Sequence, residues 1–133
     1  GWLMISTIVV TLGKVAESLL ESTEQIIGKS RAVSSFCVDW TIGIDEVEAR
    51  LQSQIQKVDQ GQGVLLLTDM FGGTSTNIAL DLQESDKIEV VTGVNLPMVV
   101  KAMTLPGTIS VHEAALQLRE QGRKAIYIAS DRL

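Results

Sequence analysis

The hydrophobic positions of this chain follow two patterns that alternate along its length. Short unbroken apolar runs, rich in Val, Ile and Leu, are typical of buried strands, and the run at 63–68 is the clearest of them. Longer stretches place apolar residues three and four positions apart, which predicts helices with one buried face. These patterns predict strands at 6–10, 32–38, 63–68, 87–92 and 124–129, and helices at 15–27, 44–58, 74–82, 96–103 and 111–121.

Strands that alternate with helices imply βαβ crossovers, and therefore a mostly parallel, doubly wound α/β sheet. The 133 residues give room for one domain, 1–133, with Met4 as the expected natural start and 1–3 as a remnant of cloning. Doubly wound sheets bind ligands outside the carboxyl ends of their strands, near the point where the strand order reverses. The loops that can form a site are therefore 11–14, 39–43, 69–74 and 92–97.

Composition and charge narrow the classes of partner. The chain is 45% hydrophobic with a net charge of −5, and this acidic, unclustered balance argues against binding to nucleic acid or to an anionic membrane. No apolar run approaches the roughly 20 residues that a membrane-spanning helix needs, so we expect a cytoplasmic protein without direct membrane insertion. The one cysteine, Cys37, can neither close an internal disulfide nor build a cysteine metal cluster. We expect neither a metal nor an organic cofactor.

The loop after the third predicted strand reads Thr68-Asp-Met-Phe-Gly-Gly-Thr-Ser-Thr-Asn77. Glycines followed by hydroxyl residues at the start of a helix can present free N–H groups to an anion, here at Gly72, Gly73 and Thr74. The alternative is an ordinary tight turn in which Thr74 caps the helix. Asp69, at the end of the strand, either orients a catalytic side chain or caps a turn.

Other residues in these loops have two interpretations each. Met70 and Phe71 either form a docking patch for a partner or fold back into the core. Asn95 either belongs to the site or caps the next helix, whose first turn suits Pro97. Trp40 either lines the cleft or covers its edge. The sequence leaves these alternatives open.

Two further residues have side chains of a nucleophilic type. His112 is the only histidine and lies early in the last predicted helix, away from the carboxyl ends of the strands. We therefore expect a surface or capping role for it rather than that of a phosphoryl acceptor. Cys37 lies in the second predicted strand without a basic partner, and we expect a buried apolar residue rather than a nucleophile.

Two long motifs resemble those of a known family. Residues 65–77, LLLTDMFGGTSTN, resemble the LLTDMFGGTPSN stretch of IIA domains in the mannose family of the sugar phosphotransferase system. Residues 90–98, VVTGVNLPM, are similar to the V-x-G-V-N-x-P-M stretch of the same family. The opening strand, the first helix and the last predicted helix and strand also fit, so the resemblance covers nearly the whole chain.

The resemblance implies a three-layer αβα domain with four parallel strands, whose C-terminal strand, here 124–129, pairs antiparallel across a homodimer. It also implies a transferase of sugar transport that works at the periphery of a membrane permease complex. In that family a histidine after the first strand takes a phosphoryl group from HPr and passes it to a IIB domain. An aspartate at the position of Asp69 orients the histidine, and the Gly-Gly-Thr turn at 72–74 receives the phosphate.

The acceptor histidine of that family is absent here. The family's loop reads roughly Gly/Ala-Thr-His-Gly, whereas residues 10–13 read Val-Thr-Leu-Gly, so Leu12 stands where the histidine belongs. An isobutyl side chain has no nucleophilic atom and cannot accept a phosphoryl group. Two further differences surround the site: Ser75 stands where the family usually has proline, and Lys14 adds a positive charge that can hold an anion.

The residues leave three functional hypotheses open, and with them the question of whether the protein is an enzyme. The first is a IIA-like protein that has lost phosphoryl transfer and regulates or scaffolds HPr-like and IIB-like partners. The second is an active phosphocarrier, either because Leu12 is an engineered substitution or because His112 or a threonine hydroxyl replaces the histidine. The third is a sensor that binds phosphate or a phosphorylated metabolite at the glycine turn. Under the first hypothesis the cleft for partners is formed by Thr11, Gly13, Met70, Phe71 and Asn95.

Overall fold

The computed structural model describes residues 3–133, so the expected cloning remnant lies, apart from Leu3, outside the described residues. Within them, four parallel strands form one sheet in the order β2-β1-β3-β4. The strands are β1 (Ser6–Leu12), β2 (Val33–Val38), β3 (Val64–Thr68) and β4 (Ile88–Thr92). The helices are α1 (Val15–Ile27), α2 (Ile44–Val58), α3 (Thr74–Asp81), α4 (Leu96–Ala102) and α5 (Val111–Lys124), followed by the short 3₁₀ helix η1 (Ala129–Arg132).

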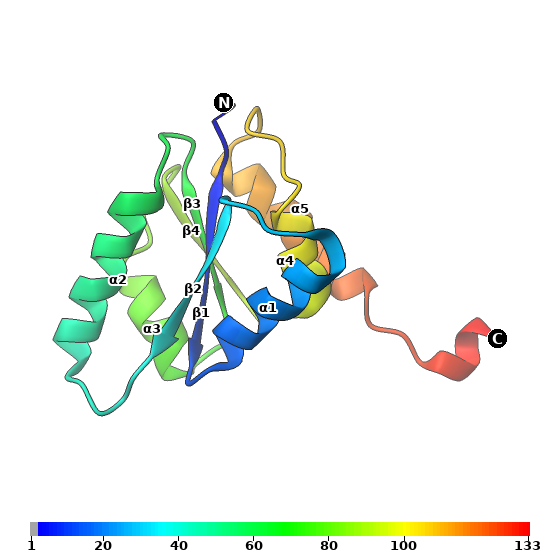
Figure 1. The fold of residues 1–133 in the computed structure, drawn as a ribbon, viewed down its shortest axis with the longest axis horizontal. Coiled ribbons are helices and arrows are strands. Elements are labelled where there is room, and N and C mark those ends of the chain that lie inside the picture. The colour runs from blue at the N-terminus through cyan, green and yellow to red at the C-terminus, as the bar shows by residue number, and fades with distance from the viewer. Residues whose placement is uncertain (1–2) are drawn as a thin grey trace.

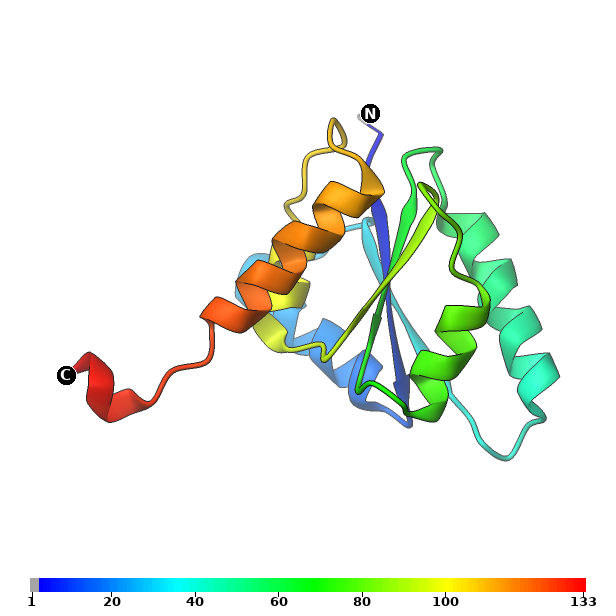
Figure 2. The same ribbon diagram turned by 180° about the vertical axis from the view of Figure 1, so that it is seen from behind.

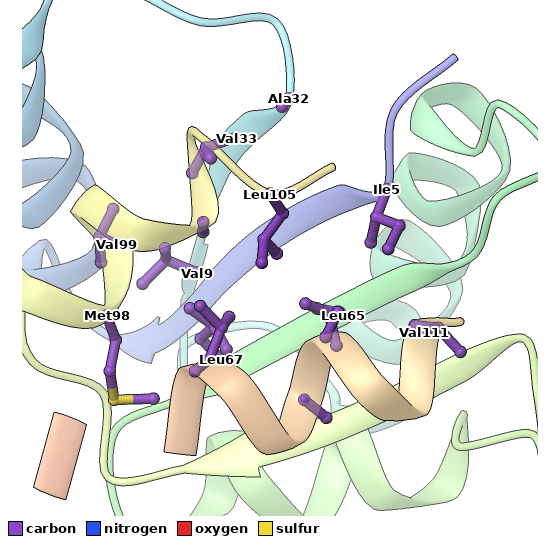
Figure 3. Close-up of a cluster of buried hydrophobic side chains, with 14 of the residues drawn as sticks. Ile5, Val9, Ala32, Val33, Leu65, Leu67, Met98, Val99, Leu105 and Val111 are labelled. Atoms are coloured by element: carbon purple, nitrogen blue, oxygen red, sulfur yellow. The ribbon is translucent and has the colours of Figure 1, made fainter. Parts of the chain in front are cut away.

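The predicted three-layer architecture is confirmed. Helices α1, α4 and α5 cover one face of the sheet, and α2 and α3 cover the other (Figure 1). All five residues of β3 are buried, with Leu65 and Leu67 on the first face and Val64 and Leu66 on the second. This burial on both faces explains why the sequence of β3 is continuously apolar. Figure 3 shows Leu65 and Leu67 packed with side chains from α4 and α5.

Most helices begin and end close to the residues that their local chemistry predicts. In α2 the buried residues Val47, Leu51 and Ile55 recur every four positions and form one apolar stripe. The side chain of Asn95 accepts a hydrogen bond from the Met98 N–H and so caps α4, as one of its two interpretations predicts. Most predicted bounds are correct within one residue, but β1 continues to Leu12 and α5 to Lys124. No helix among the described residues is long and apolar enough to cross a membrane.

The strand predicted at 124–129 is wrong for the single chain. Lys124 is the last residue of α5, residues 125–128 have no regular structure, and η1 follows them. A strand requires a neighbour for its N–H and C=O groups, and this segment projects away from the body of the protein (Figures 1 and 2). Its three large apolar side chains are exposed: Ile126 by 78%, Tyr127 by 59% and Ile128 by 69%. The pairing of this segment with a second copy stays a prediction.

Candidate functional site

The site expected from the sequence lies between β1 and β3, where the order of the strands in the sheet reverses. Strands β1 and β3 are neighbours, but α1 follows β1 on one face while α3 follows β3 on the other. The loops after these two strands therefore separate at the carboxyl ends, which is where doubly wound sheets bind ligands. Leu12 ends β1 and Asp69 directly follows β3, so the two residues meet at this switch point.

Asp69 connects the three segments that form the site. Its Oδ2 accepts a hydrogen bond from the backbone N–H of Leu12 at 2.9 Å and one from the Ser75 hydroxyl at 3.3 Å. Its Oδ1 accepts from the backbone N–H of Met70 at 2.9 Å. The half-buried carboxylate thus joins the end of β1, its own turn and the first turn of α3. The sequence predicted an orienting or turn-capping role, and this geometry adds the bond to residue 12.

Leu12 and Thr11 end β1 with side chains that are not nucleophiles in this setting. The isobutyl group of Leu12 is half-buried against the core cluster under α2 and α3. Thr11 is fully buried, and its Oγ1 accepts a hydrogen bond from the Ala16 N–H at 2.7 Å, at the start of α1. Gly13 follows with a φ of 61°, a left-handed conformation in which glycine is unstrained. Among these residues Thr11 is therefore structural, and the side chain of Leu12 packs at the border of the core.

The glycine turn is held by the backbone and not by a threonine cap. Gly73 is the N-cap of α3 and Thr74 is its first residue, so the expectation that Thr74 caps the helix is wrong. Gly72 has a φ of 84°, and a Cβ on Gly73 would lie 3.2 Å from the Met70 carbonyl oxygen. Both positions therefore favour glycine. The same hypothetical Cβ would lie 3.8 Å from Asp69 Oδ1, so the carboxylate lies against the start of α3.

A set of buried threonine hydroxyls under this turn was missed by the sequence analysis. Thr76 Oγ1 donates to the Met70 carbonyl at 2.7 Å. Its one proton is thereby used, so the 2.7 Å contact with Thr68 Oγ1 is a bond that Thr68 donates. Thr92 Oγ1 lies 3.5 Å from Thr76, at the end of the next strand. The sequence did contain a signal for this set. A threonine ends each of the neighbouring strands β3 and β4, and a third lies in α3 between them in sequence.

Large apolar side chains surround the site on two loops. Met70 is 66% exposed and Phe71 is 77% exposed, so the alternative in which they fold back into the core is wrong. Trp40, 78% exposed, lies on the loop after β2 at the same edge of the sheet. That loop is fixed by Asp39, whose Oδ1 accepts from the N–H and the hydroxyl of Thr41, and these bonds lower the pKa of the Asp39 carboxyl. We call Trp40, Met70 and Phe71 the apolar rim.

Asn95 is bonded within the fold, whereas Lys14 lies at the surface. Besides capping α4, Asn95 donates from its Nδ2 to the Gly122 carbonyl at 3.1 Å, so both ends of its amide are used within the fold. Lys14 is exposed and precedes α1. It opens onto a hollow of about 420 Å³ between α1 and Leu96.

His112 lies outside the site, as expected, whereas Cys37 is only half-buried and not the buried residue that the sequence predicted. His112 Nδ1 is 3.5 Å from Glu89 Oε1, near the start of β4. Glu89 is in register with Leu65, four residues before Asp69, which corresponds to about 13 Å along the sheet. Cys37 is half-buried in β2 and packs at the border of the core.

These observations define a doubly wound α/β domain whose site lies between the loops after β1 and β3. A family model described as "PTS system fructose IIA component" matches residues 6–118. The chain belongs to this IIA family of the phosphotransferase system.

Relatives and solved structures agree with this assignment. The chain is 30% identical over 126 residues to the mannose-specific EIIAB component of Escherichia coli, covering 92% of itself and 38% of that protein. It therefore spans about two-fifths of the length of this relative. An EIIA component from Streptococcus agalactiae superposes with a TM-score of 0.84 at 27% identity, covering 96% of this chain and 99% of that one. A mannose/sorbose-specific IIA subunit from Enterococcus faecalis gives a TM-score of 0.79 at 28% identity, covering 95% of each chain.

Proposed function

We propose that this protein is a IIA-family domain that binds phosphotransferase partners without carrying a phosphoryl group. The observation that carries the proposal is Leu12, which lies at the switch point with its N–H bonded to Asp69. The family resemblance puts the acceptor histidine at this position and its orienting carboxylate at Asp69. Here the carboxylate and the loop remain, but the side chain between them has no atom that can bond to phosphorus.

Substitute nucleophiles are poorly placed for the alternative, an active carrier. Thr11 is fully buried with its oxygen bonded to α1. Thr74 is exposed, but the only histidine that could act as its base is His112, near the other end of the sheet. A threonine phosphoester would also be too stable for onward transfer. These positions favour a binding role over transfer by another residue.

The proposed partners are HPr-like and IIB-like proteins, which would dock at the carboxyl edge of the sheet. The apolar rim supports this, since large exposed apolar side chains that surround a polar site are typical of interaction surfaces. A domain that binds these proteins without accepting their phosphoryl group would regulate or scaffold them. The proposed place of action is the cytoplasm, at the periphery of a permease complex.

One experiment tests both halves of this proposal. The protein is incubated with phosphoenolpyruvate, enzyme I and HPr, and its intact mass is measured without acid beside a IIA protein of the same family that has the histidine. Calorimetric titration with HPr and with IIB proteins measures binding. We expect no added phosphoryl mass and measurable binding to at least one partner. An acid-labile adduct would contradict the loss of transfer, and the absence of all binding would contradict the regulatory role.

We also propose that two copies assemble through residues 125–128, which we call the tail. Strand β4 is an edge of the sheet and lies beside α5, the helix that leads into the tail. Two adjoining hollows of about 330 and 290 Å³ run along β4 against α5 and share Val91, Thr92 and Arg119; we call them the β4 groove. An unpaired edge strand can bind an extended segment, and the exposed tail is apolar enough to provide one.

Charged substitutions in the tail are expected to make the protein monomeric. Replacing Ile126 and Ile128 together by Asp would remove the apolar area that the tail buries in a second copy. Sedimentation at several concentrations should then show dimer for the parent protein and monomer for the variant. Ile44→Asp is the matched control, because Ile44 is 60% exposed at the start of α2, on the opposite face of the sheet from α5, and the dimer should persist. A parent protein that is monomeric at every concentration would contradict the assembly.

A further inference from the structure

Glu89 places an acidic side chain between an edge strand and a helix. It belongs to β4, in register with the buried Leu65, and its side chain is only 20% exposed. Its ion-pair partner is His112 on α5, with 3.5 Å between His112 Nδ1 and Glu89 Oε1 and with 62% of the histidine side chain exposed. Both residues line the 290 Å³ hollow of the β4 groove. The pair thus lies on the surface that a second tail would cover.

Among the described residues, His112 is the one basic side chain that forms an ion pair with Glu89. From α5, Arg119 lines the same hollow, but its Nε lies 3.8 Å from Glu120 Oε1, so its charge is shared with a second carboxylate. Arg123 lines only the other hollow and is also 3.8 Å from Glu120. The other β4 residues in the hollow are uncharged. His112 is therefore the basic group in direct contact with Glu89, and its protonation places a positive charge beside this carboxylate.

We infer that the His112–Glu89 pair makes assembly through the β4 groove depend on pH, an inference that rests on the proposed homodimer. In the single chain, water screens the pair and its contribution is small. A tail laid along β4 would exclude that water, and a buried carboxylate without a neutralising partner is costly. Protonated His112 removes this cost, so dimer formation takes up a proton and is favoured as the pH falls from 7.5 to 5.5.

The tail brings few titrating groups of its own to the groove. Residues 125–128 contain no Asp, Glu, His, Lys or Arg, and Asp131 and Arg132 in η1 have opposite formal charges. Histidine is the side chain that changes charge between these two pH values, and the chain has only one. A change in affinity over this interval can therefore be assigned by a single substitution.

The test measures the dimer dissociation constant of the full chain by sedimentation at pH 7.5 and pH 5.5. We expect the constant to fall by about tenfold or more at the lower pH, since the dimer has two grooves and each proton taken up changes the constant by up to tenfold per pH unit. His112→Gln should keep the constant of the parent protein at pH 7.5 and lose its dependence on pH. Glu89→Gln, measured in parallel, should also abolish the dependence while leaving His112 in place.

The outcomes separate this inference from the assembly on which it rests. A dimer whose affinity is the same at both pH values overturns the inference and leaves the homodimer standing. A pH dependence that persists in His112→Gln overturns it as well, because it would arise from carboxylates elsewhere. A protein that is monomeric at both pH values and all concentrations overturns the homodimer, and with it the inference.

Discussion

Replacing Leu12 by histidine is expected to give a protein that HPr phosphorylates to near completion. The backbone of residue 12 is already fixed, because its N–H is bonded 2.9 Å from Asp69 Oδ2. A side chain that starts from this backbone lies beside a carboxylate, the group that orients a histidine and stabilises its charged form. The substitution adds the one missing atom type, a nucleophilic nitrogen, and leaves the surrounding loop unchanged.

The measurement is intact mass without acid after incubation with phosphoenolpyruvate, enzyme I and HPr. Leu12→Asn is the matched control, because it is polar and of similar size but cannot hold an acid-labile phosphoryl group; no mass should be added. Combining Leu12→His with Asp69→Asn should slow phosphorylation, since the orienting charge is then absent. A folded Leu12→His protein that HPr fails to phosphorylate would show that more than the nucleophile has been lost, and the docking of HPr would be the next property in doubt.

Most of the fold could be predicted from apolar spacing alone, because burial dictates it. The continuous run of β3 is buried on both faces, and the four-residue spacing of Val47, Leu51 and Ile55 matches the buried stripe of α2. The ends of elements were less predictable. Leu12 continues β1 because it is in register with Val38 of β2, a contact between strands that local sequence does not reveal.

The tail illustrates a second limit of the sequence. The apolar, β-branched pattern around Ile126 and Ile128 is typical of a buried strand, but the single chain leaves both side chains exposed. Strand formation depends on a neighbouring strand, and the pattern does not say whether that neighbour belongs to the same chain. The prediction at 124–129 therefore failed for the chain by itself, although its apolar character is real.

The residues of the candidate site could be predicted from the sequence, whereas the hydrogen bonds between them could not. The motif placed Asp69 and the glycine turn correctly at the carboxyl end of β3. It could not show that Asp69 bonds to the backbone of residue 12, because that contact joins residues 57 positions apart in sequence. Nor could it show that Thr76 supports the Met70 carbonyl, since threonine at the start of a helix is more often read as a cap.

Replacing Asp69 by Ala is expected to destabilise the protein by about 2 kcal/mol, even though residue 12 is a leucine. The carboxylate accepts hydrogen bonds from the N–H groups of Leu12 and Met70, and charged acceptors contribute more than neutral ones. Without it, both N–H groups at the switch point lose their partner, and only partial access to water compensates them. Chemical denaturation with urea measures the free energy of unfolding directly.

Two variants separate this structural role from a general effect of charge. Asp69→Asn keeps the shape and one carbonyl oxygen but turns an amide NH₂ toward one of the N–H groups, so we expect about half the loss. Asp81→Ala is the matched control: Asp81 is exposed at the last position of α3, where a negative charge is unfavourable to the helix dipole, so its removal should cost nothing. Equal stability of Asp69→Ala and Asp81→Ala would contradict the bonding described for Asp69. A clear difference would mean that the hydrogen bonds of Asp69 hold the loops after β1 and β3 together.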